Sequence, residues 1–132
     1  MGDLTLYFDR NFGTRLPKAL NFVKPPVTIE WHQNQRFPQE MIDDEWLEIV
    51  GKKGWLVFSH DRKFHSEATE TAAVKQHGIG CFYLPCANEP TWAKLSVFVR
   101  TFSRMMKLAE SENRPFVFDV LKTGQIKRVV LP

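Results

Sequence analysis

The sequence predicts an α/β protein, a three-layer α/β/α sandwich around a central, mostly parallel sheet with a C-terminal hairpin. Short apolar segments typical of buried strands alternate with longer segments of helical periodicity. Strands joined through helices of this length usually pair in parallel. The length of 132 residues is that of one domain, so we expect residues 1–132 to form a single unit with its own core.

The first half of the chain is expected to contain three strands and two helices. An apolar run, Leu4–Phe8, stops abruptly at Asp9 and is typical of a buried strand. Thr14 can cap the first helix, which ends at Pro25 and Pro26, and Asp43 or Asp44 can cap the second. The other strands are expected at Val27–Trp31 and Trp55–Phe58, with a polar loop from His32 to Gln39.

The second half should supply the remaining strands and the longest helix. A helix from Ser66 to Gly78 precedes a strand at Ile79–Leu84, and Thr91 opens the longest helix. The last two strands, Pro115–Leu121 and Ile126–Leu131, are expected to pair as a hairpin. We interpret an apolar stripe at helical spacing as core: Trp92, Leu95, Phe98, Phe102, Met105 and Ala109.

Composition limits the classes of function. The net charge of +3 permits contact with phosphate groups but is below that of a dedicated nucleic-acid binder. Cys81 and Cys86 have no zinc or redox spacing and are expected to be buried, reduced thiols. No apolar run is long enough for a membrane span, and Asp3 and Arg10 flank the first apolar stretch, unlike a signal peptide. We therefore expect a cytoplasmic protein without membrane contact.

Carboxylates follow two of the predicted strands. Asp9 and Asp61 come after buried strands, and ligands of parallel α/β sheets bind at the carboxyl ends of the strands. Asp43 opens a helix at the same end of the molecule. Clustered carboxylates favour a hard cation such as Mg²⁺ or Mn²⁺. Each aspartate alone could instead cap a helix or form a turn, but two strands that both end in aspartate favour the metal site.

Three segments of the chain resemble the PIN-like domain family, in particular its VapC-type toxin ribonucleases. The segments are "YFDRNFGTRLPKAL", "DDEWLEIVGKKGWLVFSHDRKF" and "KQHGIGCFYL", and the resemblance extends from Leu4 to the last hairpin. It implies that Asp9, Asp43 and Asp61 are catalytic metal ligands, with Ser59 steadying Asp61. Asp44 and Glu45 are neighbours that could substitute for Asp43.

The resemblance implies a metal-dependent endoribonuclease that cleaves RNA and is the toxin of a toxin–antitoxin pair. A small antitoxin protein is then the expected partner, and self-association as a homodimer is left open. Related sequences often have an acid where this chain has Lys63, so a fully acidic two-metal cage is in doubt. Cations beside the acidic motifs are candidates for binding the substrate phosphates: Arg10, Arg15, Arg62 and Lys63.

Other features were weighed as candidates. The four histidines (His32, His60, His65 and His77) lack zinc-ligand spacing and are interpreted as core or surface residues. Asp119 could be a fourth acid, but a charge at the margin of the sheet is the simpler interpretation. Two rival classes remain, a non-catalytic PIN-like binding module and a receiver-like phosphoacceptor domain. A receiver would need a second acid beside the first strand, where this chain has Arg10.

Overall fold

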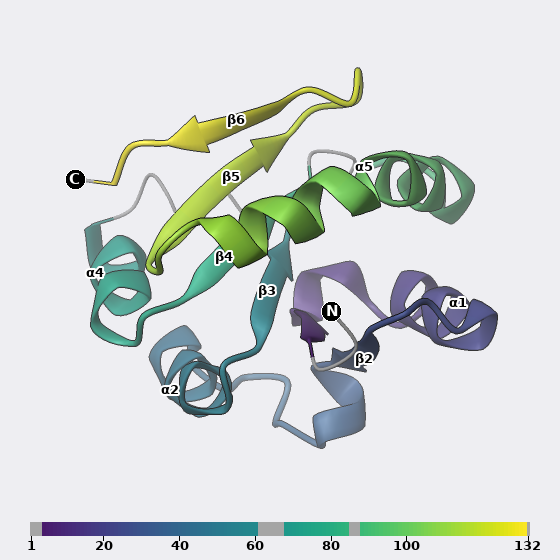
Figure 1. Ribbon diagram of the computed structural model, residues 1–132. Helices are drawn as coiled ribbons and strands as arrows, with labels where there is room; N and C mark the ends of the chain where they lie inside the picture. Colours follow the sequence, from purple (N-terminus) through teal and green to yellow (C-terminus); the bar gives the residue numbers. More distant parts are fainter. Residues whose placement is uncertain (1–3, 61–67, 85–87, 132) are drawn as a thin grey trace.

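The computed structural model describes residues 4–60, 68–84 and 88–131. Its centre is a six-stranded sheet with the order β2-β1-β3-β4-β5-β6 (Figure 1). The first five strands are parallel, and β6 returns antiparallel to β5 as a hairpin. The strands are β1 (Thr5–Phe8), β2 (Thr28–Trp31), β3 (Leu56–Ser59), β4 (Gly80–Tyr83), β5 (Phe116–Val120) and β6 (Ile126–Val129).

Helices cover both faces of this sheet, which gives the three layers expected from the sequence. The helices α1 (Arg15–Val23) and α5 (Thr91–Ser111) pack on one face. The helices α2 (Asp43–Lys53) and α4 (Ala68–Gln76) pack together on the other face (Figure 1). Two short 3₁₀ helices, η1 (Arg10–Phe12) and η2 (Gln33–Gln35), interrupt the loops that follow β1 and β2.

A ladder of phenylalanines forms the centre of the α1/α5 face. Phe8, Phe58, Phe82 and Phe118 occupy the same level of four adjacent strands. Their ring centroids are 5.1, 5.4 and 5.7 Å apart from one strand to the next. Such offset stacks add stability beyond the burial of the rings themselves. The ladder therefore fixes the register of the strands just below their carboxyl ends.

The longest helix differs in part from the core stripe expected from its sequence. Phe98 and Met105 are buried, and the side chains of Leu95 and Phe102 pack partly against the core. Trp92 is 79% exposed, so its assignment to the core was wrong. It lies in the first turn of α5, two residues after the extended residue Pro90. Helical periodicity gives the direction in which a side chain points, but not how far the sheet beneath the helix extends.

Thr14 is at the N-cap position of α1, as expected, but the cap expected for the second helix was wrong. Thr14 precedes α1 but makes no capping hydrogen bond with its side chain. The residue that precedes α2 is Ile42, and Asp43 is the first residue inside that helix. Asp43 therefore contributes its charge to the first turn, where the helix dipole favours an anion, and its side chain remains available for tertiary contacts. No helix in the described ranges has the length and apolar character required to cross a bilayer.

Candidate active site at the carboxyl edge of the sheet

The strand order creates a topological switch between β1 and β3. The chain leaves β1 towards β2 on one side, and the later parallel strands are added on the other side. In sheets of this order, ligands bind at the switch, outside the carboxyl ends of the strands. Asp9 directly follows β1 there, and its backbone N–H donates to the Phe58 carbonyl at 3.1 Å. Asp9 is thus held next to the end of β3.

The Asp9 side chain is buried and has a defined backbone partner. Only 2% of the residue is exposed. Its carboxylate accepts a hydrogen bond from the backbone N–H of Asn11 at 3.0 Å and thereby caps η1. A buried carboxylate is costly unless it is hydrogen-bonded or faces a cation. Asp9 therefore has both a structural contact and the placement expected of a functional acid.

The register places a row of polar residues one position beyond the phenylalanine ladder. Ser59 pairs with Tyr83 and Tyr83 with Asp119, while Asp9 continues β1 beside Ser59. Because side chains alternate between the faces of a strand, this row shares the α2/α4 face with Tyr7 and Cys81. Asp119 is separated from Asp9 by three strand spacings, or roughly 14 Å. Asp9 therefore lies at the switch point, whereas Asp119, at the other end of the row, is too far away to contribute to the same site.

The pKa values of Tyr7 and Cys81, two side chains on this face, are both affected by nearby carboxylates. Burial raises the pKa of the Tyr7 hydroxyl far above its usual value; Asp9 and Asp43 raise it further, whereas Arg10 lowers it. Burial also raises the pKa of the Cys81 thiol, and Asp9 and Asp119 add to the effect. Cys81 is buried and reduced, as expected, whereas Cys86 lies outside the described residues. Carboxylates therefore lie close to the carboxyl ends of the strands on the α2/α4 face.

Asp43 is connected to Asp9 through Arg10. The Arg10 guanidinium donates to the Met41 carbonyl and lies 3.5 Å from Asp43 Oδ1. The same oxygen accepts a hydrogen bond from Trp46 Nε1 at 3.0 Å. Trp46 is buried in the core and fixes the orientation of the carboxylate. The first turn of α2 and the residue after Asp9 therefore meet, as the acidic-site hypothesis requires.

The remaining candidates lie in different surroundings. Ser59 is completely buried at the end of β3. Asp44 points to α4, because its Oδ1 lies 3.0 Å from His77 Nε2. Glu45 and Arg15 are exposed on the first turns of α2 and α1. Asp61, Arg62, Lys63 and His65 fall outside the described residues. Across residues 4–60, 68–84 and 88–131, no three histidine, cysteine, aspartate or glutamate side chains could hold a metal ion.

Two histidines have structural partners near this edge. His32 is buried; its Nε2 donates to the Pro38 carbonyl at 2.9 Å, which leaves Nδ1 to accept from the Tyr7 hydroxyl at 3.0 Å. The His60 ring lies on the opposite face with its centroid 3.8 Å from that of Phe12, and its Nδ1 bonds to the Leu84 carbonyl. Both are buried in the core, one of the two surroundings expected for the histidines.

The structure places Asp119 inside the sheet, away from its margin. It was assigned to the margin of the sheet, but β5 lies between β4 and β6, and Asp119 pairs directly with Tyr83. The signal in the sequence was the aspartate in the fourth place of the strand "FVFDV", where alternation puts it on the face of Val117. Only the pairing of β5 with β4 reveals that this face also carries Asp9.

Comparison with known families agrees with this architecture. The family model described as "PIN like domain" matches residues 4–86, which is more than half of the chain. The protein belongs to the PIN-like domain family. The match includes β1 to β4 and the positions of Asp9, Asp43 and Asp61. Neither the curated proteins nor the solved structures contain a match to this chain.

Proposed function

We propose that this protein is a metal-dependent endoribonuclease whose site is formed by Asp9, Asp43 and Asp61. The observation that carries the proposal is the buried carboxylate of Asp9 at the β1/β3 switch, beside Ser59 and connected to Asp43 through Arg10. Membership of the PIN-like family supports a nuclease-type fold. In the sequence, Asp61 comes two residues after Ser59, the last residue of β3.

Asp9 and Asp43 supply two of the three carboxylates proposed for a hard divalent cation. Mg²⁺ and Mn²⁺ prefer such oxygen donors over nitrogen and sulfur ligands. Asp9 and Asp43 both raise the pKa of Tyr7, so a cation close to them would offset their negative charge. The separation of 3.5 Å between Arg10 and Asp43 is long for a charge-assisted hydrogen bond. Arg10 therefore balances the charge without a tight bond to the carboxylate.

Each residue of the site has a separate task in this mechanism. Asp9, Asp43 and Asp61 would hold Mg²⁺ or Mn²⁺, which when bound would supply polarisation of the scissile phosphate and a lower pKa of the attacking water. The Asn11 N–H holds the Asp9 carboxylate in place, and Trp46 orients that of Asp43. The Arg10 guanidinium lies beside Asp43, where we propose that it contacts a phosphate oxygen of the substrate. Arg62 and Lys63, next to Asp61 in sequence, are proposed for flanking phosphates.

The proposal is tested by comparing two carboxylate-to-amide variants. Asp9→Asn should lower cleavage of a labelled single-stranded RNA with Mn²⁺ by at least about 100-fold, since even indirect supports of a metal site typically contribute 10- to 100-fold. Glu48→Gln is the control, because Glu48 is exposed on α2 and has no part in the proposed site. Calorimetric titration should show that Asp9→Asn also weakens Mn²⁺ binding. Equal cleavage by wild type and Asp9→Asn would refute the assignment, and a wild type that binds Mn²⁺ but cuts no RNA would indicate a non-catalytic binding module.

The strand order also suits the rival receiver class. Flavodoxin-like and receiver domains share the order 2-1-3-4-5. However, Arg10 occupies the place of the second acid and pairs with Asp43. Lys122, which follows β5, forms an ion pair with Glu89 on the surface. Acetyl phosphate with Mg²⁺ should therefore leave the mass of the protein unchanged; a stable phosphoryl adduct on an aspartate would favour the receiver.

The resemblance to VapC-type toxins extends the proposal to a partner and a role. We propose that a small antitoxin protein inhibits the nuclease. Induced expression of the chain alone should then arrest growth, and expression of Asp9→Asn should not. Growth arrest of equal strength by both proteins would separate toxicity from the proposed site.

A further inference from the structure

We propose that a groove between α5 and the turn from β5 to β6 binds single-stranded nucleic acid, which under the proposed function is the RNA substrate. This groove, called the α5 groove below, is lined by Trp92, Ser96, Arg100, Arg104, Lys107 and Lys122. The α5 groove is distinct from the acidic site. Its hollows, its cations and an exposed tryptophan lie on one surface of the protein.

Hollows follow one another along this helix. One of about 350 Å³ lies beside Trp92 and Arg100 and is also lined by Leu95 and Val99. Another, of about 280 Å³, lies between Trp92, Arg100 and Lys122. A third, of about 440 Å³, is lined by Arg104 and Lys107 together with Gln125 and Ile126 from the hairpin. The surface is thus hollowed on both sides of Trp92 and farther along α5.

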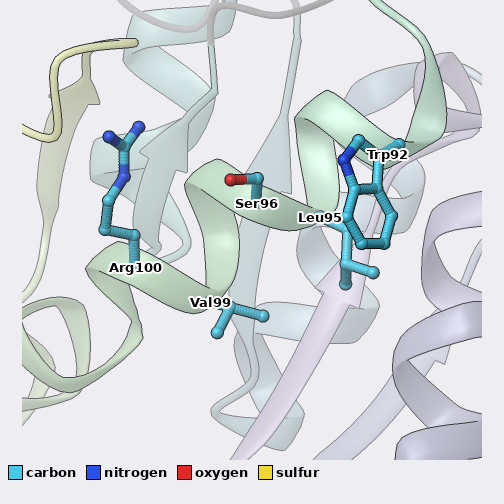
Figure 2. Close-up of a pocket in the computed structure, with 5 residues that line it drawn as sticks. All are labelled: Trp92, Leu95, Ser96, Val99 and Arg100. Carbon is cyan, nitrogen blue, oxygen red and sulfur yellow. The ribbon is translucent and has the colours of Figure 1, made fainter.

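The side chains alternate in chemistry along one ridge of α5. Trp92, Ser96, Arg100 and Arg104 are spaced by four residues, and Lys107 follows one turn later. Four residues of helix rise about 6 Å, a step comparable to that between phosphates of an extended strand. Figure 2 shows the Trp92 ring at one end of the hollow and the Arg100 guanidinium at the other, with Ser96 between them. A base can stack on Trp92 while the cations contact the backbone.

The charge of the groove fits a polyanion. Its cations are Arg100, Arg104, Lys107 and Lys122, and the acid that lines the described hollows is Glu89, which pairs with Lys122. Arg100 also donates to the Lys122 carbonyl at 2.7 Å, which joins the helix to the turn. Proteins that bind single strands combine a positive groove with exposed aromatic rings as stacking platforms. A Trp that is 79% exposed beside such cations has the form of a stacking platform.

The position of the groove connects it to the carboxyl edge of the sheet. The helix α5 begins after β4, and Lys122 follows β5, so both start at the edge that carries the acids. Lys122 is three residues beyond Asp119, a chain distance of at most about 10 Å. A single strand bound along α5 can therefore continue around this edge towards Asp9. On this view, the groove holds the part of the substrate that flanks the scissile phosphate.

Fluorescence anisotropy with a labelled RNA of about twelve nucleotides tests the groove without cleavage when EDTA is present. Trp92→Ala should weaken binding by about 10-fold or more, and Trp92→Phe should restore most of it, because base stacking contributes to affinity at each platform. Phe22→Ala is the matched control, since Phe22 is 86% exposed on α1. Binding by Trp92→Ala within twofold of wild type would overturn the proposal.

The charged residues are tested through the salt dependence of binding. The double variant Arg104→Gln/Lys107→Gln should reduce the slope of log K against log salt by about 1.4, which corresponds to two lost phosphate contacts on a single strand. The exposed pair Lys18→Gln/Lys52→Gln removes the same charge elsewhere and should leave the slope close to that of wild type. Equal slopes for the two double variants would contradict a phosphate path along α5.

The same binding experiment also tests whether the groove binds DNA, double-stranded RNA or a second copy of the protein. DNA of the same sequence should bind comparably, because neither stacking nor phosphate contact requires the 2′-hydroxyl. Tighter binding of an RNA duplex would overturn the proposal, as would a dimer that Trp92→Ala dissociates while RNA affinity is unchanged. The two proposals can fail separately. If the wild type cuts no RNA but Trp92→Ala still weakens RNA binding, the groove is supported and the proposed enzyme is refuted. If the wild type cuts RNA and Trp92→Ala binds RNA normally, the enzyme is supported and the groove is refuted.

Discussion

The two faces of the sheet carry opposite chemistry at adjacent levels of the same four strands. On the α1/α5 face, Phe8, Phe58, Phe82 and Phe118 form a continuous aromatic ladder. One residue further, on the α2/α4 face, the row is Asp9, Ser59, Tyr83 and Asp119. The difference shows how a strand can place rigid packing and reactive groups next to each other, because successive side chains point to opposite faces.

The largest effect is expected from a break in the aromatic ladder. Phe58 is fully buried and stacks on both Phe8 and Phe82. Phe58→Ala should lower the free energy of unfolding by about 3–5 kcal/mol, measured by urea denaturation. Phe22→Ala, on the exposed end of α1, should change it by less than about 0.5 kcal/mol. A loss below about 1 kcal/mol for Phe58→Ala would show that the ladder does not stabilise the sheet.

A smaller loss of stability is expected on the polar face. Tyr7→Phe removes the hydroxyl that donates to His32 Nδ1 and leaves this buried nitrogen without its partner. The free energy of unfolding should fall by about 1–3 kcal/mol, less than for Phe58→Ala. Thermal or urea melts of the two variants in parallel give the comparison. A Tyr7→Phe variant as stable as wild type would mean that a water replaces the hydroxyl.

The two acids of the polar row should differ in their effect on catalysis. Asp119 is about 14 Å from Asp9 across the strands, which is too far for both carboxylates to bind one Mg²⁺ ion at about 2 Å. Asp119→Asn should therefore lower RNA cleavage by less than about 10-fold, whereas Asp9→Asn should nearly abolish it. The comparison uses the same assay with Mn²⁺. Equal losses would show that both acids act on one reacting phosphate and that the row works as a unit.

A loss of stability is also expected in mild acid, from His60 on the aromatic side. The pKa of His60 is lowered to about 4, chiefly by burial and in part by Lys94, whereas the hydrogen bond to Leu84 opposes this change. The unfolded chain, with an ordinary histidine pKa near 6.5, binds a proton first as the pH falls. His60 therefore contributes full stability above about pH 6.5, and this contribution decreases down to about pH 4.

Urea melts at several pH values across this window test the contribution of His60. The slope of stability against pH should be smaller in His60→Phe than in wild type, because the substituted ring does not titrate. A variant with an unchanged slope would assign the acid sensitivity to other groups.

The sequence by itself determined the order of the elements and the acids that follow them. Strands such as "WLVF" are recognisable because they are buried on both faces, and Asp9 is recognisable because it ends such a run. The hairpin after Pro115 was predictable from its turn residues Thr123 and Gly124. These are local properties of the chain, so no knowledge of the fold was needed to find them.

Only the tertiary structure decided which strands are neighbours and what each side chain contacts. Asp119 could not be placed beside Tyr83 without the pairing of β5 with β4. Asp43 fits a capping position in the sequence, but its carboxylate instead bonds to Trp46 and lies near Arg10. Trp92 shares the spacing of the α5 core stripe, yet it is exposed. Sequence periodicity fixes the direction of a side chain, whereas its burial and its partners depend on segments distant in the chain.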